Sequence, residues 1–177
     1  MKKIISIALI ALSIFALVGC TPKEPAANVP VNDIMDSIKE QVKTDLIAGG
    51  VKEEQFKDGK LPGYMITDIM TDENNPTAKL FNKEEVEEGL ILQHMMNVNS
   101  NLIIVVKAKD DKVDAVKEVL AKIKEQQDKV WKQYLPDQYD KVKANVIEAK
   151  DNYVIYATYD DSAKLKEVFE KSFEKKE

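Results

Sequence analysis

The sequence predicts an α+β fold, with an antiparallel four-stranded sheet made of two ββα units and preceded by an N-terminal helix. A run of β-branched and apolar residues at 102–106, bounded by polar turn residues, is typical of a buried strand. After Asp110 and Asp111 the apolar residues change to a helical period that continues to Tyr134. The same order of hairpin, acidic cap and helix returns over residues 145–173.

The strand at 102–106 and the helix that follows it are the best-supported elements. Every residue of the strand is apolar, and neighbouring side chains of a strand point to opposite faces, so we expect cover on both faces. The N-terminal helix and residues 61–81 would supply that cover, and a partner protein is the alternative. The helix over 113–134 is expected to bury one stripe of side chains: Val113, Val116, Leu120, Ile123, Val130 and Tyr134.

Two hairpins are predicted. Residues 90–96 form a strand that pairs with the central strand through a polar turn, and strands at 145–149 and 153–159 form the second hairpin. Segments 105–111 and 155–161 match in residue type, which suggests an internal repeat; convergence of two similar elements is the alternative. A helix after each hairpin predicts that both long helices lie on one face of the sheet.

The N-terminal helix is expected to begin near Asn32 or Asp33, either of which can cap a helix. Apolar residues then recur every four positions, and the pair Gly49-Gly50 ends the helix. Residues 51–80 are less regular. Within them, residues 64–70 are apolar enough for a strand or for one helical turn.

Two shorter motifs lie within this irregular region or directly after it. Asn82, with Glu85 three residues later, predicts a capped short helix that Gly89 closes. The loop at 72–76 carries several oxygen-bearing side chains, but it lacks the spacing and the turn glycine of a calcium loop.

Pro136 breaks the long helix, and residues 137–143 are expected to form a short helix.

The first nineteen residues have the features of a secretory signal. Two lysines precede an uncharged stretch, Ile4 to Val18, which is shorter than the roughly 20 residues that span a membrane. The stretch ends at Leu17-Val18-Gly19-Cys20, which resembles the lipobox of bacterial lipoproteins. The resemblance implies cleavage before Cys20 and attachment of lipid to its thiol. The alternatives are a plain cleaved signal or an uncleaved anchor.

The remaining chain divides into a tether and one domain. Residues 20–30 contain three prolines and would reach roughly 30 Å from the membrane, at about 3.1 Å per residue. Residues 31–177 are enough for a single domain with a real core. Because Cys20 is the single cysteine, lipid attachment also explains a thiol with no disulfide partner. We therefore expect a lipid-anchored protein on the extracytoplasmic face of the cell membrane, partnered with the membrane through Cys20.

The charge balance argues against nucleic acid as a partner. The net charge is -5, and removal of Lys2 and Lys3 with the signal makes it -7. Nucleic acids require a basic face, which an acidic domain does not favour. All 26 basic residues are lysines, so the bidentate guanidinium grip on phosphates and carboxylates is absent from this chain.

Few residues suggest chemistry. His94 is the only histidine, and strand alternation points it toward the core, so neither a metal site nor a cofactor is expected. No Gly-x-Ser-x-Gly motif for serine catalysis is present, and the paired acids fall at helix caps and turns, where negative charge stabilises helix starts. Trp131, Tyr134 and Tyr139 surround the break at Pro136. They form a candidate binding surface, with packing at the edge of the core as the alternative.

Three segments carry a family resemblance. Met95-Met96-Asn97-Val98, the strand end at 104–110 and the run from Trp131 to Tyr139 resemble the domain-of-unknown-function 4358 family of bacterial lipoproteins. The similarity extends over about residues 31–173. It implies a lipid-anchored domain after a signal peptide, with no established activity and no catalytic residue to transfer.

The leading functional prediction is a membrane-tethered, non-catalytic binding or accessory domain whose ligand is unknown, with an envelope protein as a candidate partner. A cell-envelope hydrolase and a small solute-binding component of a transporter are the alternatives. A cleft that holds His94 with nearby acids would favour the hydrolase. A ligand-sized cleft between two lobes would favour the solute receptor, and a flat apolar patch would favour the accessory domain.

Overall fold

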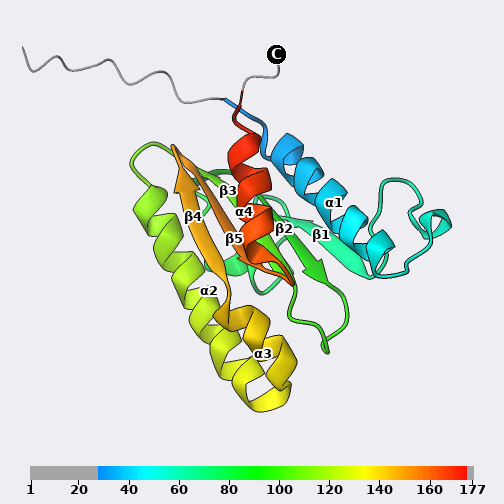
Figure 1. Cartoon of the computed structure of the whole chain (residues 1–177). Coiled ribbons are helices and arrows are strands. Elements are labelled where there is room, and N and C mark those ends of the chain that lie inside the picture. Colours follow the sequence, from blue (N-terminus) through cyan, green and yellow to red (C-terminus); the bar gives the residue numbers. More distant parts are fainter. Residues whose placement is uncertain (1–27, 175–177) are drawn as a thin grey trace, which may run out of the picture.

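The computed structural model describes residues 28–174, which form one antiparallel sheet with helices on both faces (Figure 1). The sheet has five strands in the order β1-β2-β3-β5-β4. In chain order the elements are α1 (Val31–Ala48), the 3-10 helix η1 (Glu53–Gln55), β1 (Tyr64–Asp68), the 3-10 helix η2 (Ala78–Leu80), β2 (Val86–His94), β3 (Leu102–Ala108), α2 (Val113–Tyr134), α3 (Pro136–Lys143), β4 (Val146–Lys150), β5 (Tyr153–Thr158) and α4 (Ser162–Lys171).

The prediction of an antiparallel sheet with two ββα units is confirmed, but the strand number is five and not four. The fifth strand is β1, which arises from the stretch that the sequence allowed to be a strand or a helical turn. It pairs antiparallel with β2 and forms one edge of the sheet. Its central residue, Ile66, lies opposite Leu92.

The long helices lie on opposite faces, so the prediction that both occupy one face was wrong. Leu165 and Phe169 of α4 pack with α1 against one face of the sheet, whereas Leu120 and Ile123 of α2 pack against the other. All residues of β3 are buried, because its alternating side chains enter both clusters. A sheet that is apolar on two faces requires helices on both.

The strand order and the helix positions argue against a two-fold symmetric internal repeat. β3 pairs antiparallel with β5, and β5 with β4, so β3 and β4 run parallel and need the crossover that α2 and α3 provide. A two-fold axis normal to the sheet would relate β3 to β5 but would keep both helices on one face. The two ββα units are therefore not related by such an axis, although their sequences resemble each other.

The predicted short helix between Asn82 and Gly89 was wrong. Asn82 accepts hydrogen bonds from Glu84 and Glu85 within a turn, and the chain then enters β2 at Val86. Gly89 is inside this strand, where an added β carbon would lie 2.7 Å from Cδ1 of Ile69. The glycine is required here by close packing and not by the end of a helix.

Helix α1 begins at Val31, one or two residues before the expected caps Asn32 and Asp33, neither of which caps it. The Val31 N–H donates instead to the Glu88 carboxylate on β2, at 2.9 Å. A negative side chain at a helix N-terminus interacts favourably with the helix dipole. The acceptor thus comes from another element, which local sequence signals do not reveal.

Helix α2 has the predicted bounds, but its buried stripe differs in the last turns. Val116, Leu120 and Ile123 are buried as expected, and the stripe then continues to Trp131. Val130 and Tyr134 are 57% and 51% exposed, so their assignment to the stripe was wrong. The prediction of cover for β3 is confirmed: α1 packs on one face, and Ile69, Ala78 and Phe81 join α2 on the other.

Candidate functional site

Strand β1 leaves one edge of the sheet open. At the two ends of the strand, Gly63 accepts a hydrogen bond from Met95 and Ile69 donates one to Gly89. Along a strand, every second residue turns its backbone groups toward the same neighbouring strand. Since Gly63 and Ile69 form their bonds on the β2 side, Met65 and Thr67 between them also direct their backbone groups toward β2. The N–H and C=O of Ile66 consequently point away from the sheet. An edge with unpaired backbone groups is a template for another strand.

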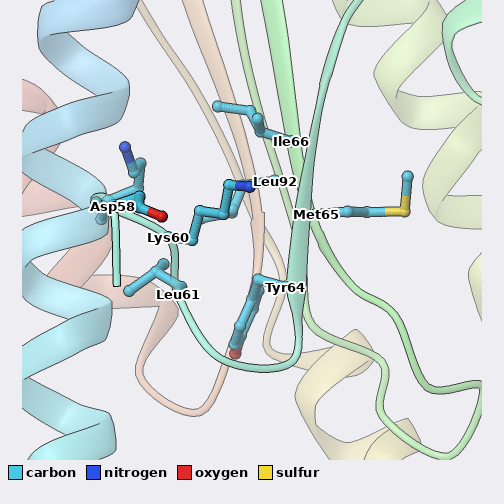
Figure 2. Close-up of a pocket in the computed structure, with 9 residues that line it drawn as sticks. Asp58, Lys60, Leu61, Tyr64, Met65, Ile66 and Leu92 are labelled. Carbon is cyan, nitrogen blue, oxygen red and sulfur yellow. The ribbon is translucent and has the colours of Figure 1, made fainter. Parts of the chain in front are cut away.

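The side chains of β1 leave the same edge apolar. Met65 and Ile66 are 39% and 50% exposed, and β1 itself contains no lysine or proline, the residues that commonly protect edge strands. Ile66 lies on the face that α1 covers, and Met65 points to the opposite face (Figure 2). The free edge therefore combines open hydrogen-bonding groups with exposed apolar side chains on both faces.

A hollow of about 470 Å³ lies between β1, α1 and the loop at 58–61, and we call it the α1–β1 groove. Its apolar wall consists of Leu61, Tyr64, Ile66 and Leu92, and Lys39, Asp58 and Lys60 supply charge (Figure 2). The Tyr64 hydroxyl accepts a hydrogen bond from Asn101 at 2.7 Å, and burial raises the pKa of Tyr64 above its usual value. The wall thus remains neutral at physiological pH.

The two lysines of the groove differ in their partners. Lys39 forms an ion pair with Asp36 at 2.9 Å, within α1. Lys60 has no ion-pair partner among the described residues. Lys60, which lines the groove beside Asp58, is therefore available to pair with a carboxylate of an incoming molecule.

The opposite edge of the sheet is protected. All residues of β4 are partly buried, and both α2 and α4 contact this strand. Glu148 of β4 forms an ion pair with Lys166 of α4 at 3.1 Å. Only one of the two sheet edges, that of β1, therefore combines exposed apolar side chains with free backbone groups.

The beginning of the described chain is fixed to the face that carries α1. The Tyr153 hydroxyl donates to the Val29 carbonyl at 2.7 Å and accepts from the Val29 N–H at 3.0 Å. Buried Lys107 donates to Asn28 and forms an ion pair with Glu87 at 2.7 Å. The hydrogen bond to Glu87 raises the pKa of Lys107. Residues 28 and 29 are thereby held against the face that carries α1.

His94 lies in a separate hollow of about 280 Å³ at the loop between β2 and β3. Its Nδ1 accepts a hydrogen bond from the Met96 N–H at 3.2 Å, and its ring packs edge-on against Tyr64. Among the described residues that line this hollow there is no aspartate or glutamate. The arrangement provides no carboxylate partner for a catalytic histidine there.

The three predicted aromatic residues of the binding surface differ in their exposure and in their contacts. Trp131 is 6% exposed and donates from Nε1 to Gln127 at 2.7 Å, so it serves the core edge. Tyr134 is exposed, with its ring 5.8 Å from that of Trp131. Tyr139 is partly buried, and Lys143 lies over its ring. Leu17, Val18, Gly19 and Cys20 fall outside the described residues.

Residues 28–174 contain no cluster of three or more histidine, cysteine or acidic side chains that could hold a metal ion. In the acidic loop, Asp72 accepts from the N–H groups of Asn74 and Asn75, and Asn75 in turn caps η2. These oxygens stabilise turns. Within the same described range, no helix has the length and apolarity needed to cross a bilayer.

The open edge of β1 was not identified from the sequence. Its signal was present: a short apolar run between turn residues, with no lysine inside it. A sequence pattern shows that such a strand can form, but its position in the sheet depends on which other strands pair. The exposed position of Met65 and Ile66 follows from that topology.

The family model described as "Domain of unknown function (DUF4358)" matches residues 70–159, about half of the 177-residue chain. The matched range begins after β1 and ends just after β5, so α1 and β1 precede it and α4 follows it. The range is shorter than the resemblance noted over residues 31–173. Neither the curated proteins nor the solved structures that were searched gave a match.

Proposed function

The chain belongs to the DUF4358 family, and from this premise we propose that it is a lipid-anchored extracytoplasmic protein whose domain binds another polypeptide along β1. The family description assigns no activity, so the proposal depends on the residues of this chain. The observation that carries it is the open edge at Ile66, beside the apolar α1–β1 groove.

Lipid attachment at Cys20 is supported by the sequence alone. The lipobox-like Leu17-Val18-Gly19-Cys20 precedes a proline-containing stretch, Thr21 to Pro30, that can act as a tether. Cys20→Ser should abolish incorporation of a labelled fatty acid and cause the uncleaved precursor to accumulate. Normal labelling of this variant would refute the lipoprotein assignment.

Binding of an extended polypeptide is supported by the kind of groups that β1 exposes. Backbone groups of an added strand would pair with Ile66, and its side chains would alternate between the α1–β1 groove and the face that carries Met65. The hollow at His94 has no acidic lining residue among those described, so no feature of that hollow supports the hydrolase alternative. The groove lies within one domain and not between two lobes, so it does not support the solute-receptor alternative either.

The test compares two variants in a strain that lacks the gene. Ile66→Pro removes an N–H that the protein's own sheet does not use, and proline is tolerated at such edge positions. We expect this variant to fold but to lose the cellular role, and His94→Ala to retain it. Protein levels and resistance to proteolysis control for folding. A folded Ile66→Pro protein that complements, beside a His94→Ala protein that fails, would favour the hydrolase.

A further inference from the structure

We propose that the polypeptide that pairs with β1 is a second copy of this chain, joined edge to edge about a two-fold axis through Ile66. The proposal rests on the function proposed above, since it specifies the partner of the same edge. Two five-stranded sheets would then form one continuous antiparallel sheet of ten strands. Such an interface is isologous, because each copy contributes the same strand.

The backbone of β1 is suited to pairing with itself. Ile66 is the middle residue of a five-residue strand, and both its N–H and its C=O point outward. In an antiparallel pair, two residues that face each other through outward groups exchange both hydrogen bonds. Ile66 and the partner's Ile66 would form such a pair, which is self-complementary without any rearrangement of the sheet.

The side chains are compatible with this register. On the face that carries α1, Ile66 meets the partner's Ile66, and Tyr64 meets the partner's Asp68. On the other face, Met65 meets the partner's Thr67. Asp68 would approach the region of the other copy in which Lys60 lines the groove beside Tyr64. At each end of an apolar centre, an acidic residue of one copy would thus lie near a part of the other copy that contains both Lys60 and Asp58.

The position of the chain start also agrees with a second copy. A two-fold axis between antiparallel neighbouring strands is normal to the sheet, so the α1 faces of both copies lie on the same side. Val29 packs into the cluster beneath α1 in each copy, and Tyr153 fixes it there. In both copies Val29 would therefore lie on the same side of the continuous sheet. Two lipid anchors could then insert into the same membrane.

The first experiment places a single cysteine on β1 of the full chain in native membranes. In Ile66→Cys the two thiols would face each other across a hydrogen-bonded pair, with a Cα separation of about 5.5 Å, which is within disulfide range. Met65→Cys is an exposed neighbouring control that is out of register, and Glu118→Cys at an exposed position of α2 controls for random collisions. Wild-type protein gives the background of Cys20, the only native cysteine.

After mild oxidation we expect Ile66→Cys to give at least fivefold more disulfide-linked dimer than either control. Equal yields from Ile66→Cys and Glu118→Cys would overturn the proposal, and a maximum at Met65→Cys would refute the two-fold axis at Ile66. Adding Ile66→Pro to a chain that carries Met65→Cys should leave its yield at the level of Glu118→Cys.

Two claims can be refuted independently: that β1 binds a polypeptide, and that this polypeptide is a second copy of the chain. If Ile66→Cys gives no dimer while Ile66→Pro still loses the cellular role, the edge is a binding surface for a different partner, and the second copy is excluded. If the dimer forms but Ile66→Pro retains the cellular role, self-association stands and the binding function proposed above is wrong.

Discussion

Substitution of Gly89 by alanine tests the packing between β1 and β2. The added β carbon would lie 2.7 Å from Cδ1 of Ile69 and 3.2 Å and 3.3 Å from its Cβ and Cγ1. Overpacking of this kind typically costs about 1–3 kcal/mol. The lower backbone entropy of an alanine in the unfolded chain offsets roughly 0.5–1 kcal/mol of that cost. We therefore expect Gly89→Ala to lower the free energy of unfolding by about 1–2 kcal/mol.

A second substitution identifies the atom responsible. Ile69→Val removes the Cδ1 that makes the closest approach, and alone it should cost about 0.5–1.5 kcal/mol. In the Gly89→Ala background the same change should cost about 1 kcal/mol less, because the clash is relieved. Ile155→Val, in the cluster on the opposite face, is the matched control and should be additive.

The assay is urea unfolding of the four members of the cycle and of the control, followed by circular dichroism. The packing account requires a coupling between Gly89 and Ile69 that is well above the roughly 0.3–0.5 kcal/mol of independent sites. If Gly89 instead closed a helix, as its sequence context suggested, alanine would also destabilise the protein, but Ile69→Val would not restore any stability. A coupling near zero would refute the structural explanation.

Three further predictions concern the core, the pH dependence and metals. Val105→Lys should lower the free energy of unfolding by at least about 3 kcal/mol, because Val105 is fully buried and a lysine charge there would have no partner. A melting temperature equal to that of wild type would contradict this prediction. Burial raises the pKa of Tyr156 from 10.0 to about 12, so the unfolded chain loses this proton at a lower pH than the folded protein does. The stability that Tyr156 contributes is therefore fully present below pH 10 and should fall by about 3 kcal/mol as pH rises toward 12. Tyr156→Phe should make the fall above pH 10 shallower, and an unchanged slope would refute the assignment. Chelator should not shift the thermal midpoint, since no cluster of metal ligands occurs in residues 28–174; a drop of several degrees would reveal a site.

Strong local patterns allowed parts of the fold to be predicted. The apolar run of β3 and the helical period of α2 each depend on residues close in sequence, and both elements form as expected. The acidic cap predicted before the last helix is also present: the Asp161 carboxylate accepts from the Lys164 N–H at 2.9 Å at the start of α4. Burial on both faces of β3 could be inferred because every residue of that strand is apolar.

The errors occur where distant elements decide the outcome. Asn82 and Glu85 have the spacing of a helix cap, but the chain turns there and pairs as β2, because β1 and β3 lie on either side of it. The faces occupied by α2 and α4 depend on the insertion of β5 between β3 and β4, which no local pattern encodes. Trp131 was included in the candidate surface, yet its position on α2 turns its ring into the core edge.

The central claim, that the domain acts through the free edge of β1, is tested most directly by a photo-crosslinking amino acid placed at Ile66 in living cells. Glu118 on α2 is the matched exposed control. The account predicts a discrete adduct from position 66, whether with a second copy or with another envelope protein, and none from position 118. It also predicts that Asp68→Pro, which removes another N–H directed outward by the register of β1, reduces the adduct more than Asp68→Ala, which removes only the carboxylate that accepts from Met70 and Thr71. Equal labelling at positions 66 and 118, or an adduct that persists unchanged in Asp68→Pro, would contradict it.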